Sequence, residues 1–136
     1  MVALPSSGPL MRFVLLAAPL LPAASAVAQP LEDCPRYSLQ TLTSWMQSPE
    51  TRIAAYGHTC RAINLDQLLS QQAREGFTPA DPLYWTESYR SQIGIIDRAM
   101  TVNRAWAGPD AVRNLGMLNR LYLKYRKLGA APGQEL

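Results

Sequence analysis

The sequence is poor in the side chains from which most metal and catalytic sites are built. It contains one histidine, His58, and two cysteines, Cys34 and Cys60, among 136 residues. A structural zinc site needs four ligands, and one histidine with two cysteines that we expect to be oxidised cannot supply them. His58 and Cys60 are two residues apart, so on a helix they point in different directions and do not form a Cys–His nucleophile. We therefore expect no metal, no cofactor and an exposed, functionally silent His58.

Several short motifs are also absent, and each absence excludes a class of function. The chain has no CxxCH for covalent haem attachment, no Gly-rich phosphate loop and no GxSxG elbow. No stretch alternates β-branched and polar residues, so we expect no sheet. Residues 52–69 resemble a helix-turn-helix slightly, but the spacing is wrong by a residue or more. We expect no nucleic-acid partner.

The one long apolar run lies near the N-terminus and would make a poor membrane-spanning helix. A basic start at Met11-Arg12 precedes about sixteen apolar residues that two prolines interrupt. This pattern predicts a signal peptide over residues 1–28, with Met11 as a possible true start. Small residues suit cleavage after Ala26 or Ala28, and we favour Ala28. An uncleaved membrane anchor is the less favoured alternative, and the mature protein would be periplasmic or secreted.

Both cysteines lie beyond this leader, and their even number in an exported chain predicts a Cys34–Cys60 disulfide. The alternative is two free thiols or a redox pair. Closing a loop of this length would stabilise the fold by roughly 3–4 kcal/mol in the chain-entropy model.

Residues 29–129 are predicted to form one all-α domain, a small bundle of four or five helices, with a flexible tail over 130–136. Apolar residues recur at helical spacing, and Ser, Asp, Pro, Asn and Gly mark helix ends. The expected helices are a short one carrying Leu39 to Met46, one from Pro49 to Gly76 with a kink or restart at Asn64, one from Pro82 to Ala107 and one from Pro109 to Leu128.

Two positions in the second of these helices carry specific predictions. Asn64 with Gln67 resembles a capping box, and the apolar pattern changes phase there, which favours a kink. Gly57 lies close to the apolar face, where its missing side chain would let another backbone approach. It is otherwise an unfavourable residue inside a helix, by about 1 kcal/mol.

A basic stripe runs along the last expected helix, nearly opposite its apolar face. Its members are Arg113, Arg120, Lys124 and Lys127. The ordinary interpretation is a solvated face, since cations near a helix C-terminus also complement the helix dipole. The functional interpretation is contact with an acidic protein surface or with anionic lipid headgroups.

Basic residues are also concentrated in the C-terminal part of the chain as a whole, and acidic residues in the part before it. Residues 29–89 hold four arginines and seven acidic residues, whereas residues 90–128 hold eight basic and two acidic ones. Complementary halves of one fold would explain this layout, and so would an acidic partner. Trp106, beside the Gly108-Pro109 corner, is the aromatic residue most suited to an exposed apolar patch.

Two function hypotheses remain. We prefer an exported, non-enzymatic binding or accessory protein that engages an acidic or amphipathic partner in the cell envelope through the basic stripe and Trp106. The alternative is a small helical enzyme or small-molecule carrier with a pocket between its helices. Such a pocket would be lined by Tyr84, Tyr89, Tyr122 and Tyr125.

Overall fold

The computed structural model describes residues 29–129, and within that range five helices pack together. They are the 3-10 helix η2 (Leu31–Arg36) and the α-helices α1 (Leu39–Met46), α2 (Thr51–Arg74), α3 (Tyr84–Trp106) and α4 (Ala111–Gly129). These residues contain no strand. The expected all-α fold is confirmed, whereas the expected leader (1–28) and tail (130–136) lie outside the described residues. Between residues 29 and 129, no helix combines the length and apolar character of a membrane span.

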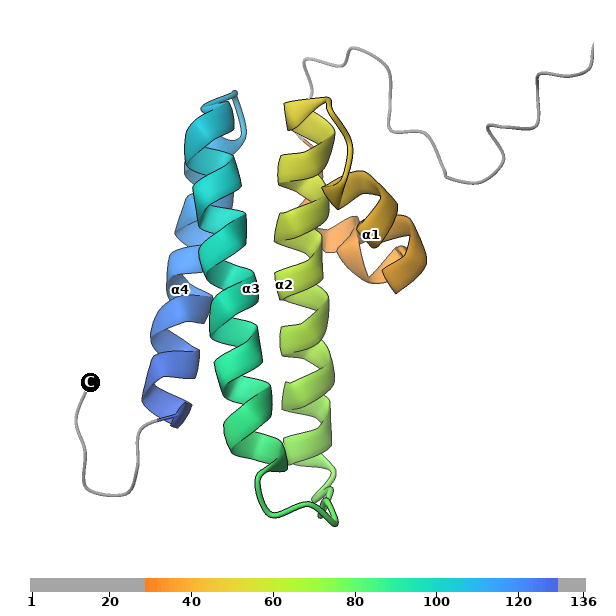
Figure 1. Ribbon diagram of the computed structural model, residues 1–136, viewed down its shortest axis with the longest axis vertical. Helices are drawn as coiled ribbons and strands as arrows, with labels where there is room; N and C mark the ends of the chain where they lie inside the picture. The colour runs from red at the N-terminus through yellow and green to blue at the C-terminus, as the bar shows by residue number, and fades with distance from the viewer. Residues whose placement is uncertain (1–28, 130–136) are drawn as a thin grey trace, which may run out of the picture.

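The three long helices run side by side, and α3 contacts both α2 and α4 (Figure 1). The short helices η2 and α1 pack on α2 near its N-terminal end, on the side away from α4 (Figure 1). α1 has 8 residues and α2 has 24. On that side, none of the helices within residues 29–129 covers the C-terminal half of α2.

The polar residues that precede the helices cap α1 directly but close a turn ahead of α2 and α3. The Ser38 hydroxyl oxygen accepts a hydrogen bond from the N–H three residues on, at 3.1 Å, and caps α1. Ser48 and Asp81 instead accept from the N–H two residues on, at 3.1 and 2.9 Å. These bonds close a turn ahead of the helix, so α2 begins at Thr51 and α3 at Tyr84. Like them, α4 begins two residues after its proline.

The predicted kink at Asn64 is wrong, because α2 is continuous from Thr51 to Arg74. The Asn64 side-chain Nδ2 donates to the carbonyl oxygen of Cys34 at 2.8 Å, so it ties η2 to α2 instead of capping a new helix. In its N-terminal half α2 has buried residues on nearly all sides, since η2, α1 and α3 all pack there. The apolar pattern changes phase because the cover provided by these helices ends there, and α2 does not bend.

Cys34 and Cys60 form the predicted disulfide, which joins η2 to α2 with a Cα–Cα distance of 4.9 Å. Both residues are fully buried. The rings of Tyr37, Trp45 and Tyr56 pack against one another in the same core cluster, with centroid separations of 4.7 to 6.2 Å. The aromatic rings and the cross-link thus belong to one core cluster between the short helices and α2.

The close approach predicted at Gly57 is confirmed. A Cβ atom added there would lie 2.9 Å from the Trp45 Cβ and 3.0 Å from the Met46 backbone nitrogen. Real Cβ atoms do not come this near to such neighbours, so glycine lets the end of α1 lie directly on α2.

Three buried polar side chains, one from each long helix, form a hydrogen-bonded chain across the bundle. Asn114 Nδ2 on α4 donates to Asn103 Oδ1 on α3 at 2.9 Å, and Asn103 Nδ2 donates to Thr59 Oγ1 on α2 at 3.0 Å. The Thr59 hydroxyl donates onward to the carbonyl oxygen of Ala55 at 2.7 Å. The three side chains are at most 1% exposed, and buried polar groups of this kind persist because they are paired.

Candidate functional site

The C-terminal half of α2 forms an open groove, with the N-terminal half of α3 on one side and the short helix α1 on the other. Two adjoining hollows of about 280 and 300 Å³ lie there, and both are lined by Arg61, Leu65 and Leu68. We call the two together the α2 groove. Its lining is Tyr37, Leu39, Leu42, Arg61, Asn64, Leu65, Leu68, Leu69, Tyr84, Glu87, Ser88 and Ser91.

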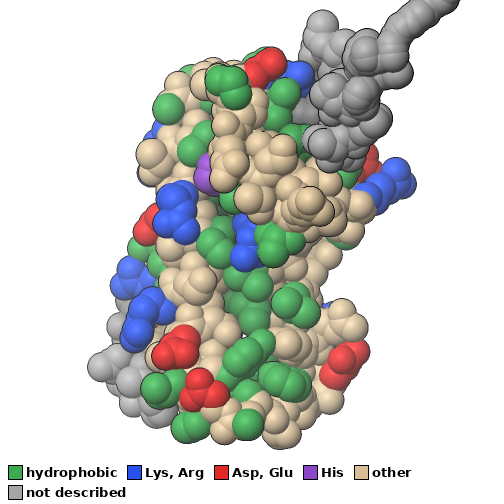
Figure 2. Space-filling model, turned by 45° about the vertical axis from the view of Figure 1, so that its right-hand side comes forward, with side chains coloured by type: hydrophobic (Ala, Val, Ile, Leu, Met, Phe, Trp, Pro, Cys, Tyr) green, Lys and Arg blue, Asp and Glu red, His purple; other side chains and the backbone are tan. Residues whose placement is uncertain are grey.

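The α2 groove is mostly apolar. Leu39 is 57% exposed and Leu68 51%, while Leu65 is half-buried and Leu42 and Leu69 are buried beneath them. Figure 2 shows hydrophobic side chains gathered in the hollowed flank of the molecule, with basic side chains at its edge and within it. Apolar surface concentrated in a concave place is typical of an interaction site, because covering it releases water.

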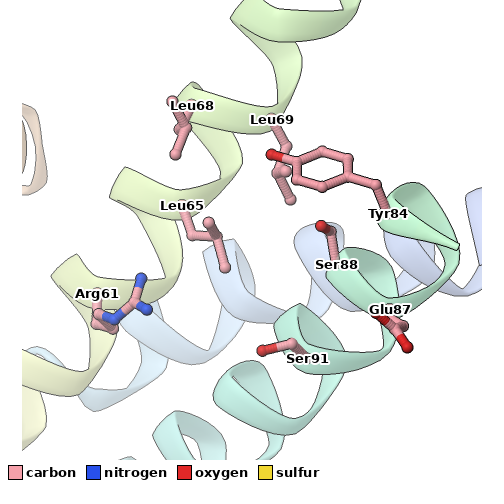
Figure 3. A pocket seen from close by; sticks show the side chains of 8 residues that line it. All are labelled: Arg61, Leu65, Leu68, Leu69, Tyr84, Glu87, Ser88 and Ser91. Atoms are coloured by element: carbon pink, nitrogen blue, oxygen red, sulfur yellow. The ribbon is translucent and has the colours of Figure 1, made fainter. Parts of the chain in front are cut away.

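Arg61 is the charged side chain that lines both hollows, and it is half-buried. Among residues 29–129 its guanidinium forms no ion pair. Burial lowers the pKa of this guanidinium, since loss of water penalises the charged form, but an arginine remains charged at neutral pH. Figure 3 shows Arg61 on the α2 wall and Glu87 on the opposite, α3 wall. An anion entering the groove would therefore meet a cation without a competing partner.

The lining of the α2 groove combines apolar, hydroxyl and charged side chains. Its lining contains two serines, Ser88 and Ser91, but neither histidine nor cysteine to activate them. Across the described range, no group of three or more His, Cys, Asp or Glu side chains gathers to hold a metal ion. Among the lining residues Arg61 is the one cation and Glu87, on the opposite wall, the one carboxylate, and apolar surface lies between them.

The basic stripe predicted on α4 is partly engaged within the fold. Lys124 Nζ lies 2.6 Å from Asp66 Oδ1 on α2, and Arg113 Nη2 lies 2.9 Å from Asn114 Oδ1 and 3.7 Å from an Asp110 oxygen. Arg120 and Lys127 are exposed. Lys124 thus joins α4 to α2 and Arg113 is paired with neighbours at the start of α4, whereas Arg120 and Lys127 remain accessible to a partner.

Asp66, the α2 residue that binds side chains of α4, was not singled out from the sequence. Its Oδ1 accepts from Lys124 and from the Tyr125 hydroxyl, both at 2.6 Å, and from Ser70 at 3.3 Å. Burial, together with the nearby Asp66 carboxylate, raises the pKa of Tyr125. Asp66 therefore fixes the C-terminal half of α4 to α2 through one charged and one neutral donor.

Three of the four tyrosines proposed to line a pocket belong to a single aromatic cluster. The rings of Tyr84, Trp85, Tyr89 and Tyr125 follow one another with centroid separations of 5.2 to 5.8 Å. Tyr122 lies apart from this series, and its hydroxyl accepts a hydrogen bond from the arginine one turn on, at 2.8 Å. Of the four, only Tyr84 lines the α2 groove.

Trp106 is half-buried and folds back over the corner between α3 and α4. A Cβ atom added at Gly108 would overlap its indole ring. Ala107, between them, has a left-handed backbone with φ of 52° and ends α3. The tryptophan thus covers its own corner, and only part of its ring is available to a partner.

His58 is half-buried, not exposed as predicted. Burial, reinforced by the positive charge of Arg98, lowers its pKa below the usual 6.5. It does not line the α2 groove, so its environment matters to stability and not to the candidate site.

The residues that sequence reasoning missed carry a recognisable signal. Arg61, Leu65, Leu68 and Leu69 recur at helical spacing, i, i+4, i+7 and i+8. This stripe is the second apolar phase that suggested a kink.

Comparisons of the chain with protein-family models, with curated proteins and with solved structures found no match to any of them.

Proposed function

We propose that this protein is an exported, non-enzymatic binding protein whose α2 groove holds an amphipathic, acidic helix of a partner protein. The observation that carries this proposal is the stripe of Arg61, Leu65 and Leu68, which has helical spacing and which no helix of the described part of the chain covers. The partner's apolar face would lie on the two leucines, and a glutamate or aspartate on it would pair with Arg61.

The dimensions of the groove favour a helix over a small molecule. From Arg61 to Leu69, α2 advances roughly 12 Å, which matches about two turns of a docked helix. Taken singly, the hollows of about 280 and 300 Å³ lie at or below the lower bound of about 300–1,000 Å³ for small-molecule pockets, so a small molecule would have to span both. A helix packed on α2 and α3 beneath α1 would also complete a four-helix arrangement.

Export is supported by two independent features. Residues 11–28 have the order of a signal peptide, with a basic start, an apolar core and small residues at the end. The Cys34–Cys60 disulfide is of the kind that persists in oxidising compartments. Together they favour a periplasmic or secreted partner.

The proposal is tested with a pair of synthetic helical peptides that differ at one position. Both carry a leucine stripe, and the residue facing Arg61 is glutamate in one and glutamine in the other. We expect the Arg61→Gln variant to bind the glutamate peptide roughly threefold to tenfold more weakly and the glutamine peptide unchanged. Fluorescence anisotropy gives the affinities, and ¹⁵N NMR shifts locate the bound peptide.

Two exposed leucines provide a matched pair of variants for the same assay. Leu68, in the groove, is 51% exposed, and Leu123, on α4, is 60% exposed. Leu68→Asp should abolish peptide binding, whereas Leu123→Asp should leave it intact. Equal effects of the two variants, or peptide-induced shifts confined to α4, would refute the groove as the binding site.

The outer face of α4 supports a second candidate function, contact with an anionic membrane surface. Val112 and Leu123 are 84% and 60% exposed and lie on the same side of α4 as the exposed Arg120 and Lys127. Binding to vesicles that contain anionic lipid, weakened by Leu123→Asp and by salt, would support it. Equal binding to neutral vesicles would count against it.

A further inference from the structure

Gln29 is buried, although it begins the lead-in to the first helix. The residue is 4% exposed, and its backbone nitrogen donates to Asp110 Oδ2 at 3.0 Å, across 81 positions of sequence. The carbonyl oxygen of the next residue, Pro30, accepts a hydrogen bond from the Tyr56 hydroxyl at 2.6 Å. Two hydrogen bonds thus fix the first two described residues to α2 and to the corner before α4.

Asp110 is set in a polar environment that leads into the core. Its side chain is 12% exposed, and its Oδ2 lies 3.7 Å from Arg113 Nη2. Arg113 in turn donates to Asn114 Oδ1 at 2.9 Å, and Asn114 continues to Asn103 at 2.9 Å. The carboxylate that receives Gln29 is therefore coupled to the buried polar chain between the long helices.

The sequence identifies Gln29 by a separate argument, because cleavage of the predicted leader after Ala28 would make it the first residue. We propose that Asp110 is the acceptor for the N-terminus that this processing creates. The inference rests on the proposed export. A signal peptidase would hydrolyse the Ala28–Gln29 bond, so that Ala28 leaves with a carboxylate and Gln29 keeps an α-amine, which is protonated at neutral pH.

Processing changes the strength of the contact without changing its geometry. Before cleavage the Gln29 nitrogen is a neutral amide donor, and afterwards it is an ammonium facing a mostly buried carboxylate. A charge-assisted hydrogen bond is roughly twice as strong as a neutral one. Cleavage after Ala26 would instead leave two residues ahead of Gln29 and keep its nitrogen neutral, so the contact distinguishes between the two cleavage sites.

The pairing is tested on two purified, oxidised proteins, one beginning at Gln29 and one that retains Ala28. Both keep the Gln29 nitrogen as a donor, but only the first has it charged. We expect the protein that begins at Gln29 to melt about 5 °C higher, a shift reasonable for one added charged contact in a domain of this size. Mass spectrometry confirms that Gln29 has not cyclised with loss of ammonia, which would remove the charge.

Asp110→Asn, made in both proteins, isolates the partner. The difference in melting temperature should disappear in this background, because the acceptor no longer carries a charge. Equal melting temperatures of the two proteins with Asp110 intact would overturn the inference. A difference that persists after Asp110→Asn would overturn it as well, since the ammonium would then be acting through another group.

A second measurement separates this inference from the proposed export. The full-length chain is expressed in a Gram-negative host, and the N-terminus of the protein in the envelope fraction is determined by mass spectrometry. We expect Gln29. A mature protein that begins at Val27 would overturn the inference while leaving export intact. A chain that keeps residues 1–28 and stays in the cytoplasm would overturn both.

Discussion

At the scale of single residues, Gly57 determines how closely α1 can lie on α2. The position tolerates no Cβ without movement, since the Met46 backbone nitrogen would be only 3.0 Å away. Gly116, on α4, is the contrasting case, because a Cβ there would have no neighbour within 4 Å. The two glycines share a helical backbone and differ in what surrounds them.

We predict that Gly57→Ala lowers the free energy of unfolding by about 1–2 kcal/mol. Displacing α1 should cost about 1–3 kcal/mol, which exceeds the gain of up to about 1 kcal/mol in helix propensity. Gly116→Ala should show that gain alone and stabilise the protein. Urea denaturation of both variants measures the difference, and a Gly57→Ala protein as stable as Gly116→Ala would contradict the close approach.

His58 makes the stability of the fold depend on pH in a predictable direction. Its pKa in the folded protein is lowered, first by burial and then by Arg98, whereas in the unfolded chain it stays near 6.5. As pH falls below about 6.5, the unfolded chain therefore takes up the proton first, and stability is lost until the pH passes below the folded value. Above about 6.5 this contribution is fully present.

An NMR titration can follow this single histidine directly. We expect its pKa to lie below about 6.5 and to move back toward that value in Arg98→Gln. We also expect His58→Gln to remove its part of the pH dependence of the melting temperature. A folded-state pKa at or above about 6.5 would show that burial does not govern the imidazole.

At the scale of elements, the disulfide holds η2 and α1 on α2. Reduction, or replacement of Cys34 and Cys60 by serine, should lower the free energy of unfolding by roughly 3–4 kcal/mol, because the open chain gains the freedom of a 26-residue separation. The measurement is urea denaturation with and without reductant. A change below about 1 kcal/mol would mean that aromatic packing and the hydrogen bonds of Asn64 and Tyr56 hold the short helices without the cross-link.

The helices themselves could be predicted from local chemistry, since caps, prolines and apolar spacing act within a few residues. The prediction erred where a distant element decided the outcome. The change of apolar phase at Asn64 suggested a bend, whereas it marks the end of the cover provided by η2 and α1. Periodicity reports which sides of a helix are buried, and it cannot tell a bend from the loss of a neighbour.

The candidate site was harder to predict for the same reason. The cations of α4 were visible in the sequence, but Asp66, the partner of Lys124, lies 58 residues earlier in the chain. Arg61 and Leu68 were equally visible, but the α2 groove exists because α1 is short relative to α2 and packs at one end of it. That arrangement depends on tertiary structure, which no local pattern contains.

At the scale of the whole molecule, the segregation of charge along the chain contributes little to holding the fold together. Of the four ion pairs within the described range, only Lys124–Asp66 joins two different helices, and the others link residues at most three apart. Lys124 is itself 41% exposed, so water and salt weaken the pair.

We therefore predict that stability is nearly independent of salt. Raising sodium chloride to about 0.5 M should change the free energy of unfolding by less than about 1 kcal/mol. Thermal and urea unfolding at low and high salt provide the measurement. A loss of more than about 2 kcal/mol would show that attraction between the acidic and basic halves is a principal source of stability.

The polar chain of Thr59, Asn103 and Asn114 has a consequence for the alignment of the long helices. Leucine-rich faces can slide past one another by one turn and still bury similar area, so apolar packing alone leaves the axial register weakly defined. A slip at this level would leave amide groups buried without partners, at a penalty of about 1–3 kcal/mol for each. The three side chains thus favour one axial register of α2, α3 and α4 over registers in which a helix is shifted by one turn.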